Sequence, residues 1–244
     1  YFDTAYGYHG GKSEVFVGKA LREHRSKVMI ATKLPVWNVQ QPEDMERIFR
    51  EQLQRLQTDY VDIYHVHGLG APTWEKMKQM GVLEFMDGLV RDGRIRFAGF
   101  SFHDELKVFK EIVDAYDWSV CQIQYNFYDR DYQAGKEGLD YAAARNIGVV
   151  IMEPLRGGKL VHPVPPEVQA IWDAAPSRKS PAEWCMRWVY NHEGVSTVLT
   201  GASTLAQLVD HTRGVKDAAP DSLTNEELAV FDRVRAEYRR MVRV

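Results

Sequence analysis

The sequence predicts an α/β fold, a (β/α)8 barrel of the TIM type formed as one domain over residues 1–244. Short apolar runs alternate with helical patterns along the whole chain. Several runs are apolar at nearly every position, as expected for parallel strands that are covered on both faces. No change of composition and no low-complexity segment marks a domain boundary, and barrels of this kind reach 244 residues as a single unit.

Seven segments are predicted to be strands because they are rich in β-branched and aromatic residues and are bounded by Gly, Pro or Asp. They are residues 1–5, 28–33, 60–67, 95–101, 120–126, 148–152 and 196–200. A standard barrel has eight strands, so we expect the first strand to lie upstream of Tyr1. An open doubly wound sheet is the alternative, but it usually carries G-x-G-x-x-G after its first strand, and the sequence has no such motif.

The segments between these strands repeat apolar residues with the 3.6-residue period of a helix. The clearest stripes lie in residues 42–57, 83–90 and 106–113. Ser-Pro-Ala-Glu at 180–183 and Thr-Asn-Glu-Glu at 224–227 match the capping box and predict a helix start at each place. The proline-rich stretch 163–166 predicts a loop with a short helix of its own.

Composition excludes several classes of protein. Lys and Arg total 31 and Asp and Glu total 34, so the net charge of −3 argues against a basic surface for nucleic acid. No apolar run is long enough for a membrane span. The two cysteines, Cys121 and Cys185, are too few for a disulfide framework or a four-cysteine zinc site. Their scarcity fits a reducing compartment, and we expect a cytoplasmic protein with neither nucleic-acid nor membrane partners.

Candidate chemistry gathers at the predicted strand ends. Asp3, Lys33 and His67 stand at the ends of three consecutive strands, and Tyr8 follows the first of them. Carboxyl ends of parallel barrel strands share one rim, with neighbouring strands about 4.8 Å apart, so these side chains can meet. Each residue alone has an ordinary explanation: Asp3 can cap a turn, and Lys33 can form an ion pair with it.

Together, these four side chains predict an acid catalyst. A tyrosine has a reference pKa of about 10 and is a poor acid at pH 7, but a neighbouring cation favours its phenolate. A buried aspartate would keep the lysine charged and oriented. A histidine beside the phenol can hold a carbonyl oxygen. Such a site protonates an oxygen while a hydride reaches the attached carbon.

Several motifs in order along the chain resemble those of the aldo-keto reductases. They are Phe-Asp-Thr-Ala-Tyr-Gly-Tyr at 2–8, Gly-Gly-Lys-Ser-Glu at 10–14, Ala-Thr-Lys-Leu-Pro at 31–35, Asp-Tyr-Val-Asp-Ile-Tyr at 59–64 before His67, and Gly-Arg-Ile-Arg-Phe-Ala-Gly-Phe-Ser at 93–101. The resemblance implies a (β/α)8 barrel that reduces an aldehyde or ketone, a small-molecule carbonyl substrate, with NADPH or alternatively NADH. It assigns catalysis to Asp3, Tyr8, Lys33 and His67.

The resemblance also implies cofactor contacts. It places the nicotinamide against Ser101, Gln122 and Met152. It places the pyrophosphate within Pro154, Leu155, Gly157 and Lys159, where glycine N–H groups allow close approach. It places the adenosine end against Gly201, Ser203, Gln207 and His211, near a helix N-terminus suited to anions.

At four positions the sequence departs from the family pattern. Met152 replaces a residue that is often aromatic, Glu153 stands where many members have Ser, and His211 stands where Asn is expected. Gln207 replaces an Arg found in many members, which weakens the expectation of NADPH over NADH.

Residues 152–160 and 100–104 are most similar to a bacterial and archaeal branch that often continues into a ferredoxin-like tail. The sequence ends at residues 241–244 without the closely spaced cysteines of such a tail, so its residues do not support an iron–sulfur cluster.

Two other functions compete with carbonyl reduction. His65-Val66-His67 could bind a metal in a barrel hydrolase, but the later predicted strand ends lack further His or Asp ligands, so we expect no metal site. A non-catalytic, cofactor-binding regulatory or redox-sensing subunit is the stronger alternative, although all four catalytic residues are present. Trp37, Trp74 and Phe127 could form walls of a substrate pocket or equally belong to the core.

Overall fold

The computed structural model describes residues 1–241. The chain divides into two compact units. The first unit comprises residues 1–123 and 144–148, and the second comprises residues 124–143 and the chain from 149 onward. The expectation of one domain over 1–244 stays a prediction, and residues 242–244 lie outside the described part.

Each of the seven predicted segments overlaps an observed strand. They are β1 (Phe2–Asp3), β2 (Ile30–Leu34), β3 (Val61–Leu69), β4 (Ile95–Phe102), β5 (Val120–Gln124), β6 (Gly148–Met152) and β7 (Val195–Val198). In the first unit each strand from β1 to β4 pairs in parallel with the next one along the chain. In the second unit β6 and β7 also pair in parallel. The α/β class with parallel strands is therefore confirmed, and the first unit lacks the reversal of strand order that defines a doubly wound sheet.

The strand register of the first unit places polar side chains on one face. Asp3 is opposite Ala31, Lys33 is opposite His65, and Ser101 is opposite Gln122. His65 is also opposite Gly99, two residues before Ser101. Because alternate residues of a strand share a face, Asp3, Lys33, Ser101 and Gln122 all point to the same side of the sheet.

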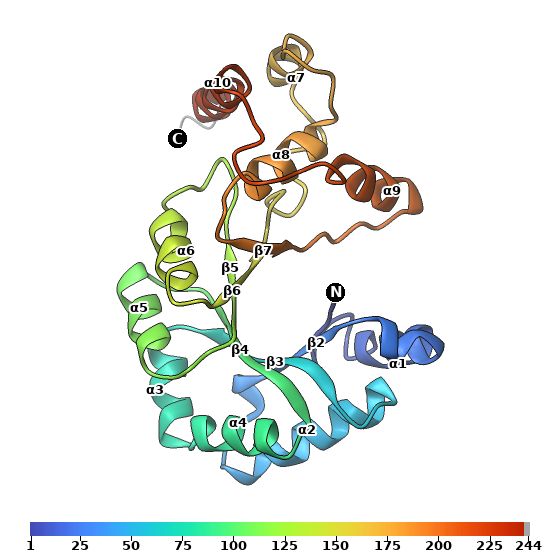
Figure 1. Cartoon of the computed structure of the whole chain (residues 1–244), viewed down its shortest axis with the longest axis vertical. Coiled ribbons are helices and arrows are strands. Elements are labelled where there is room, and N and C mark those ends of the chain that lie inside the picture. The colour runs from blue at the N-terminus through green and yellow to red at the C-terminus, as the bar shows by residue number, and fades with distance from the viewer. Residues whose placement is uncertain (242–244) are drawn as a thin grey trace. The chain divides into compact units, whose positions relative to one another are not determined.

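Helices flank the strands of the first unit and lie along their outer side (Figure 1). They are α1 (Ser13–Leu21), α2 (Glu43–Leu56), α3 (Ala71–Gln79), α4 (Val82–Arg91) and α5 (Leu106–Asp114), with 3₁₀ turns η1 (Arg22–Lys27) and η2 (Val36–Asn38). The helices predicted within 42–57, 83–90 and 106–113 are α2, α4 and α5.

The buried side of α2 differs from the predicted apolar stripe at one place. Met45, Ile48 and Phe49 are buried as expected, but Leu53 is only half-buried and Gln52 is fully buried beside it. A buried amide is tolerated when it is hydrogen-bonded. Gln52 meets this condition through Glu14, Lys33 and Tyr64, as described below.

In the second unit both predicted helix starts are present. Its helices are α6 (Gly135–Ala143), α7 (Pro166–Asp173), α8 (Pro181–Tyr190), α9 (Leu205–Gly214) and α10 (Asn225–Met241). The N–H of Glu183 donates to Ser180 Oγ at 3.1 Å before α8. Before α10, Thr224 and Glu227 bond reciprocally, side chain to backbone N–H, at 3.0 and 3.2 Å. The helix expected after the proline-rich stretch is α7.

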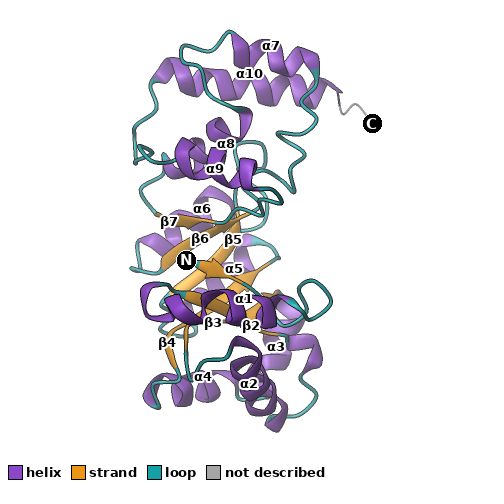
Figure 2. Ribbon diagram, turned by 90° about the vertical axis from the view of Figure 1, so that its right-hand side faces the viewer, coloured by secondary structure: helices purple, strands orange, loops and turns teal. Residues whose placement is uncertain are grey.

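Aromatic side chains form the core of the second unit. The rings of Trp172 and Trp184 stack at 5.8 Å, and the ring of Phe231 meets Trp172 edge-on at 5.5 Å. Phe127 is buried against the same cluster, which makes it a core residue rather than a pocket wall. Helix α7 packs against α10, and α8 packs against α9 (Figure 2).

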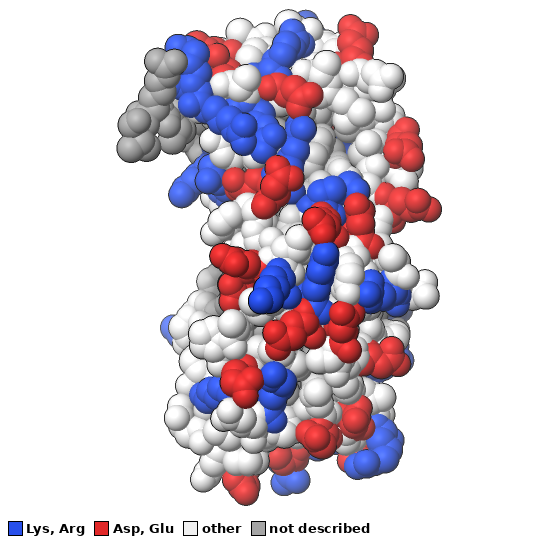
Figure 3. Space-filling view, turned by 90° about the vertical axis from the view of Figure 1, so that its left-hand side faces the viewer, with Lys and Arg blue, Asp and Glu red and all other residues white. Residues whose placement is uncertain are grey.

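The surface mixes both signs of charge. Figure 3 shows Lys and Arg interspersed with Asp and Glu on the face it draws. Some of these charges pair within one helix, as Lys136 does with Asp140 at 2.6 Å. Within residues 1–241, no helix combines the length and the apolar character needed to cross a membrane.

Candidate active site

Lys33 carries a charged amine into the interior of the first unit. It lies in β2, where every residue is buried, and only 1% of its own surface is exposed. Its Nζ lies 2.5 Å from Asp3 Oδ2 and donates to the carbonyl oxygen of Thr4 at 2.8 Å. A buried ammonium group needs such partners, because burial without a counter-charge strongly disfavours the charged form. Asp3 and Thr4, at the end of β1, therefore hold the amine at a fixed place.

Tyr8 lies on the loop that follows β1. Its N–H donates to the carbonyl of Ala5 at 3.1 Å, and its own carbonyl accepts from the N–H of Gly11. Gly10 and Gly11 adopt φ values of 64° and 81°, which suit glycine, and they turn the chain into α1. The turn brings the Tyr8 ring over Lys33, with Nζ 4.9 Å from the ring centroid. Tyr8 as a whole residue remains 39% exposed.

His67 completes the group predicted from the sequence. It lies in β3, and its ring meets that of Tyr8 nearly perpendicularly, with centroids 6.0 Å apart. Trp37, in η2, covers the other part of the imidazole at 4.8 Å and keeps 55% of its surface exposed. Of the three candidate wall residues, Trp37 is thus placed at this group. Trp74 is buried in the core.

The electrostatic environment keeps His67 neutral. Burial, followed by the nearby charges of Lys33 and His103, lowers the pKa of His67 to about 3. A neutral imidazole has one donor and one acceptor nitrogen. Nδ1 of His67 is buried and has no hydrogen-bond partner among the described residues.

Burial also affects Asp3. It raises the pKa of the Asp3 carboxyl above its ordinary value, although Lys33 opposes this rise by its charge and its hydrogen bond. Oδ1 of Asp3 is buried without a partner among residues 1–241, while Oδ2 bonds Lys33. The carboxyl group is therefore committed to Lys33 on one side and desolvated on the other.

A buried polar network lies behind Lys33, and the sequence analysis did not find it. Glu14 is fully buried, and its Oε1 accepts from Thr32 and from Gln52, both at 2.6 Å. Gln52 also donates to the carbonyl of Lys33 at 3.0 Å and accepts from Tyr64 at 2.7 Å. The network ties α1 and α2 to the strand that carries the amine. Its signal in the sequence was Gln52, a polar residue next to an apolar stripe.

Ser101 and Gln122 extend the same face of the sheet. Both are buried, and Ser101 Oγ accepts from the N–H of Gly68 at 2.7 Å. Oε1 of Gln122 is buried and lacks a hydrogen-bond partner among the described residues. An unpartnered buried carbonyl oxygen is costly unless a ligand N–H meets it. This observation fits a carboxamide ligand such as the one the sequence predicts.

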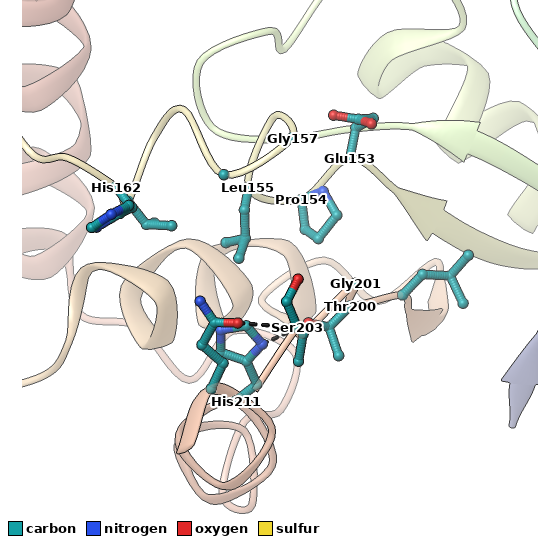
Figure 4. A pocket seen from close by; sticks show the side chains of 14 residues that line it. Glu153, Pro154, Leu155, Gly157, His162, Thr200, Gly201, Ser203 and His211 are labelled. Carbon is teal, nitrogen blue, oxygen red and sulfur yellow. Dashed lines mark hydrogen bonds between the residues drawn. The ribbon is translucent and has the colours of Figure 1, made fainter. Parts of the chain in front are cut away.

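The second unit contains a cavity of about 470 Å³, shown in Figure 4. Seven of the residues predicted to contact a cofactor line it. They are Pro154, Leu155, Gly157, Gly201, Ser203, Gln207 and His211. Gly157 and Gly158 adopt φ values of 62° and 87°, so the loop presents backbone to the cavity without a side chain in the way. Pro154 and Leu155 point from this loop toward Ser203 and His211 (Figure 4).

Other predicted contacts do not line this cavity. Lys159 is exposed and is not among the lining residues, and Met152 is half-buried at the end of β6. Conversely, His162 and Thr200 line the cavity although the sequence did not single them out. Nothing in the sequence marks His162 as a cavity residue, because it reaches the cavity only when the loop of residues 153–162 has folded.

The part of the chain that the structure describes offers no group of three or more His, Cys, Asp or Glu able to hold a metal ion. His65 is fully buried, and its Nε2 lies 3.4 Å from the hydroxyl of Tyr1.

Comparison with known proteins identifies the family of this chain. The model of the "Aldo/keto reductase family" matches residues 1–234. The chain is 27% identical to a methylglyoxal reductase of Escherichia coli K12 over an alignment of 239 residues. The alignment covers 95% of this chain and 78% of the relative.

Solved structures show the same likeness. The holo form of an aldo-keto reductase from Bacillus halodurans matches with a TM-score of 0.78 and 28% identity, over 96% of this chain and 81% of that one. An aldo/keto reductase from Klebsiella pneumoniae in complex with NADP and acetate matches with a TM-score of 0.77 and 26% identity, over 96% and 79%. On its motifs, its parallel strands and the extent of the family match, this chain belongs to the aldo/keto reductase family.

Proposed function

We propose that this protein reduces a small aldehyde or ketone to an alcohol, with Tyr8 as the general acid. The observation that carries the proposal is the position of the Lys33 amine, 4.9 Å from the centre of the Tyr8 ring and held by Asp3. The proposal assigns to this ammonium group the stabilisation of the phenolate that Tyr8 would become after it gives up its proton. Membership of the family supports an oxidoreductase, and the likeness to solved reductases supports a (β/α)8 barrel as the scaffold.

A reduced nicotinamide dinucleotide supplies the hydride when it is bound. In the first unit, Oε1 of Gln122 would accept from the carboxamide N–H₂, beside the hydroxyl of Ser101. In the second unit, the glycine-rich loop at 154–158 and the residues Gly201, Ser203, Gln207 and His211 would hold the phosphates and the adenosine. We retain Met152 and Lys159 as further candidate contacts.

The residues of the first unit divide the remaining work. The Tyr8 hydroxyl gives its proton to the substrate oxygen, and Lys33 stabilises the resulting phenolate. Asp3 keeps the amine of Lys33 charged and fixed. Because His67 is neutral, its ring N–H can hold the carbonyl oxygen without competing with Tyr8 as an acid. Trp37 offers an apolar wall beside it.

Methylglyoxal is the first substrate to test, because one relative is named as a methylglyoxal reductase. The purified protein is mixed with NADH or NADPH and methylglyoxal, and dinucleotide oxidation is followed at 340 nm. We expect turnover that depends on the carbonyl compound. A panel of aldehydes and ketones of increasing size follows if methylglyoxal is poor.

The same experiment distinguishes the proposed reductase from the alternative, a non-catalytic regulatory subunit that binds the cofactor. Tight binding of a reduced dinucleotide with no turnover of any carbonyl in the panel would contradict the proposal and favour a cofactor-binding regulatory subunit. Failure of both dinucleotides to bind would exclude both functions.

A further inference from the structure

The cavity of the second unit has no lysine or arginine among the described residues that line it. Fourteen residues form its wall, and only Glu153, His162 and His211 among them can titrate. Glu153 is acidic. In Figure 4 its carboxylate points to the side of the loop away from Ser203 and His211. The wall therefore contributes no permanent positive charge to a ligand.

His211 does not supply a cation either. It is 7% exposed, and Thr200 Oγ1 lies 2.6 Å from its Nδ1. Burial is the main cause that lowers the pKa of His211 below its ordinary value, and the charge of Asp210 opposes this effect. The imidazole is therefore mainly neutral at pH 7, and its hydrogen bond holds it in place.

Gln207 occupies the first turn of α9 (Leu205–Gly214), in the part of the cavity that the family resemblance assigns to the adenosine. The side-chain Oε1 of Gln207 accepts from the backbone N–H of Ser203 at 2.8 Å. The backbone N–H of Gln207 donates to Thr204 Oγ1 at 3.2 Å. The carboxamide thus closes the turn that starts the helix. Many members of the family have an arginine here, and this chain has a neutral side chain that is already bonded to the backbone.

The neighbouring cations do not replace that charge. Nε of Arg156 lies 3.0 Å from Asp129 Oδ2, and its guanidinium group lies 4.7 Å from the centre of the Tyr128 ring. Lys159 is exposed and is not part of the wall.

NADH and NADPH differ only at the 2′ position of the adenosine ribose, and the charges in the cavity wall affect this position. The adenosine 2′-phosphate of NADPH carries a charge of about −1.5 to −2 at pH 7 and is usually held by arginine or lysine. The free 2′-hydroxyl of NADH is neutral and needs only polar partners. Backbone N–H groups and the side chains of Ser203 and Gln207 can provide such partners.

We infer that the cavity of the second unit selects against the 2′-phosphate, so that this protein uses NADH in preference to NADPH. The inference rests on the proposed function, which requires one of the two dinucleotides. A solved neighbour holds NADP, so the expected preference follows from the side chains of this chain and not from the shared fold.

The first experiment titrates the intact protein with NADH and with NADPH, by calorimetry and by quenching of tryptophan fluorescence. Binding NADPH would place the charge of its 2′-phosphate against a wall whose described residues include no lysine or arginine, which costs free energy, so we expect NADH to bind at least about ten-fold more tightly. Equal binding, or tighter binding of NADPH, would overturn the inference and leave the proposed function intact. Binding of neither dinucleotide would overturn the proposed function, and the inference with it.

The second experiment restores the charge. Gln207→Arg is expected to tighten NADPH binding about ten-fold, in a salt-sensitive manner, and to change NADH binding by less than about three-fold. Gln207→Met is the matched control, because it also removes the contact to Ser203 but adds no charge. It should change the affinities for both dinucleotides by the same factor. A gain for NADPH in Gln207→Met equal to that in Gln207→Arg, or no gain in Gln207→Arg, would overturn the assignment.

Discussion

The amine of Lys33 and the carboxylate of Asp3 form a 2.5 Å ion pair between the ends of two adjacent strands, and the lysine is almost fully buried. The pair lies beneath the ring of Tyr8. Its geometry places the charge of Lys33 against the Tyr8 ring and makes that charge dependent on Asp3 for a partner. This dependence can be tested separately in stability and in catalysis.

Asp3→Asn should destabilise the protein by about 3 kcal/mol, because it leaves a buried ammonium without its counter-charge. We expect a lower urea midpoint and also a lower kcat. The double variant Asp3→Asn with Lys33→Met removes both charges, so it should recover much of the unfolding free energy while kcat stays low. Equal urea midpoints for the wild type and Asp3→Asn would show that the pair does not stabilise the fold.

Tyr8→Phe removes the hydroxyl that is proposed to donate the proton. General acid catalysis contributes about 10²- to 10⁴-fold, so kcat should fall by a factor in this range. The half-exposed ring is retained, and the unfolding free energy should change by less than about 0.5 kcal/mol. Steady-state kinetics and dinucleotide titration measure the two effects. An unchanged kcat would remove the assigned role.

His67 predicts a specific pH dependence of stability. Its pKa is about 3 in the folded protein and about 6.5 in an unfolded chain, so between these values the unfolded state binds more protons. The stability contribution is complete above about pH 6.5 and is lost as the pH falls toward 3. In His67→Gln the slope of the unfolding free energy against pH should be smaller in this range, by up to about 1.4 kcal/mol per pH unit.

Urea unfolding at several pH values between 4 and 7 measures the slope. His24→Gln is the control, because His24 lies exposed in η1, and its slope should match that of the wild type. Identical slopes for the wild type and His67→Gln would contradict the burial of a neutral imidazole.

Glu14→Gln tests the network behind Lys33. The substitution keeps the size of the side chain but replaces a fully buried acceptor that serves Thr32 and Gln52 and pairs with Arg55 at 3.2 Å. We expect a loss of about 2 kcal/mol in unfolding free energy. The control Glu51→Gln removes a more exposed partner of Arg55 and should cost less than about 1 kcal/mol. Equal losses in the two variants would argue against the network.

Two glycine substitutions should act in opposite directions. A Cβ at Gly18 would lie 2.5 Å from backbone atoms of Leu56, where α1 approaches α2, so Gly18→Ala should destabilise by about 1–3 kcal/mol. At Gly88 in α4 a Cβ would lie 3.7 Å from the flexible tip of the Arg91 side chain, so Gly88→Ala should stabilise the protein by about 0.5–1 kcal/mol. Thermal and urea unfolding compare the signs.

Much of the fold follows from local patterns. The strands β2 and β6 could be predicted because continuous apolar runs identify parallel strands buried on both faces, and the helix starts at Ser180 and Thr224 because a capping box needs only four residues. The four active-site candidates could be named for a related reason: parallel strands of one sheet end at one rim, so order along the chain predicts proximity.

What the tertiary structure alone decided depends on contacts between distant residues. Gln52 became a buried hydrogen-bonding residue because Glu14, 38 positions earlier, reaches it across two helices. The neutral state of His67 depends on its burial and on Lys33. The described wall around Gln207 has no lysine or arginine, and the nearby Arg156 pairs with Asp129. Desolvation and pairing are properties of an environment, so they exist only after the chain has folded, whereas periodicity and capping are already present in the order of the residues.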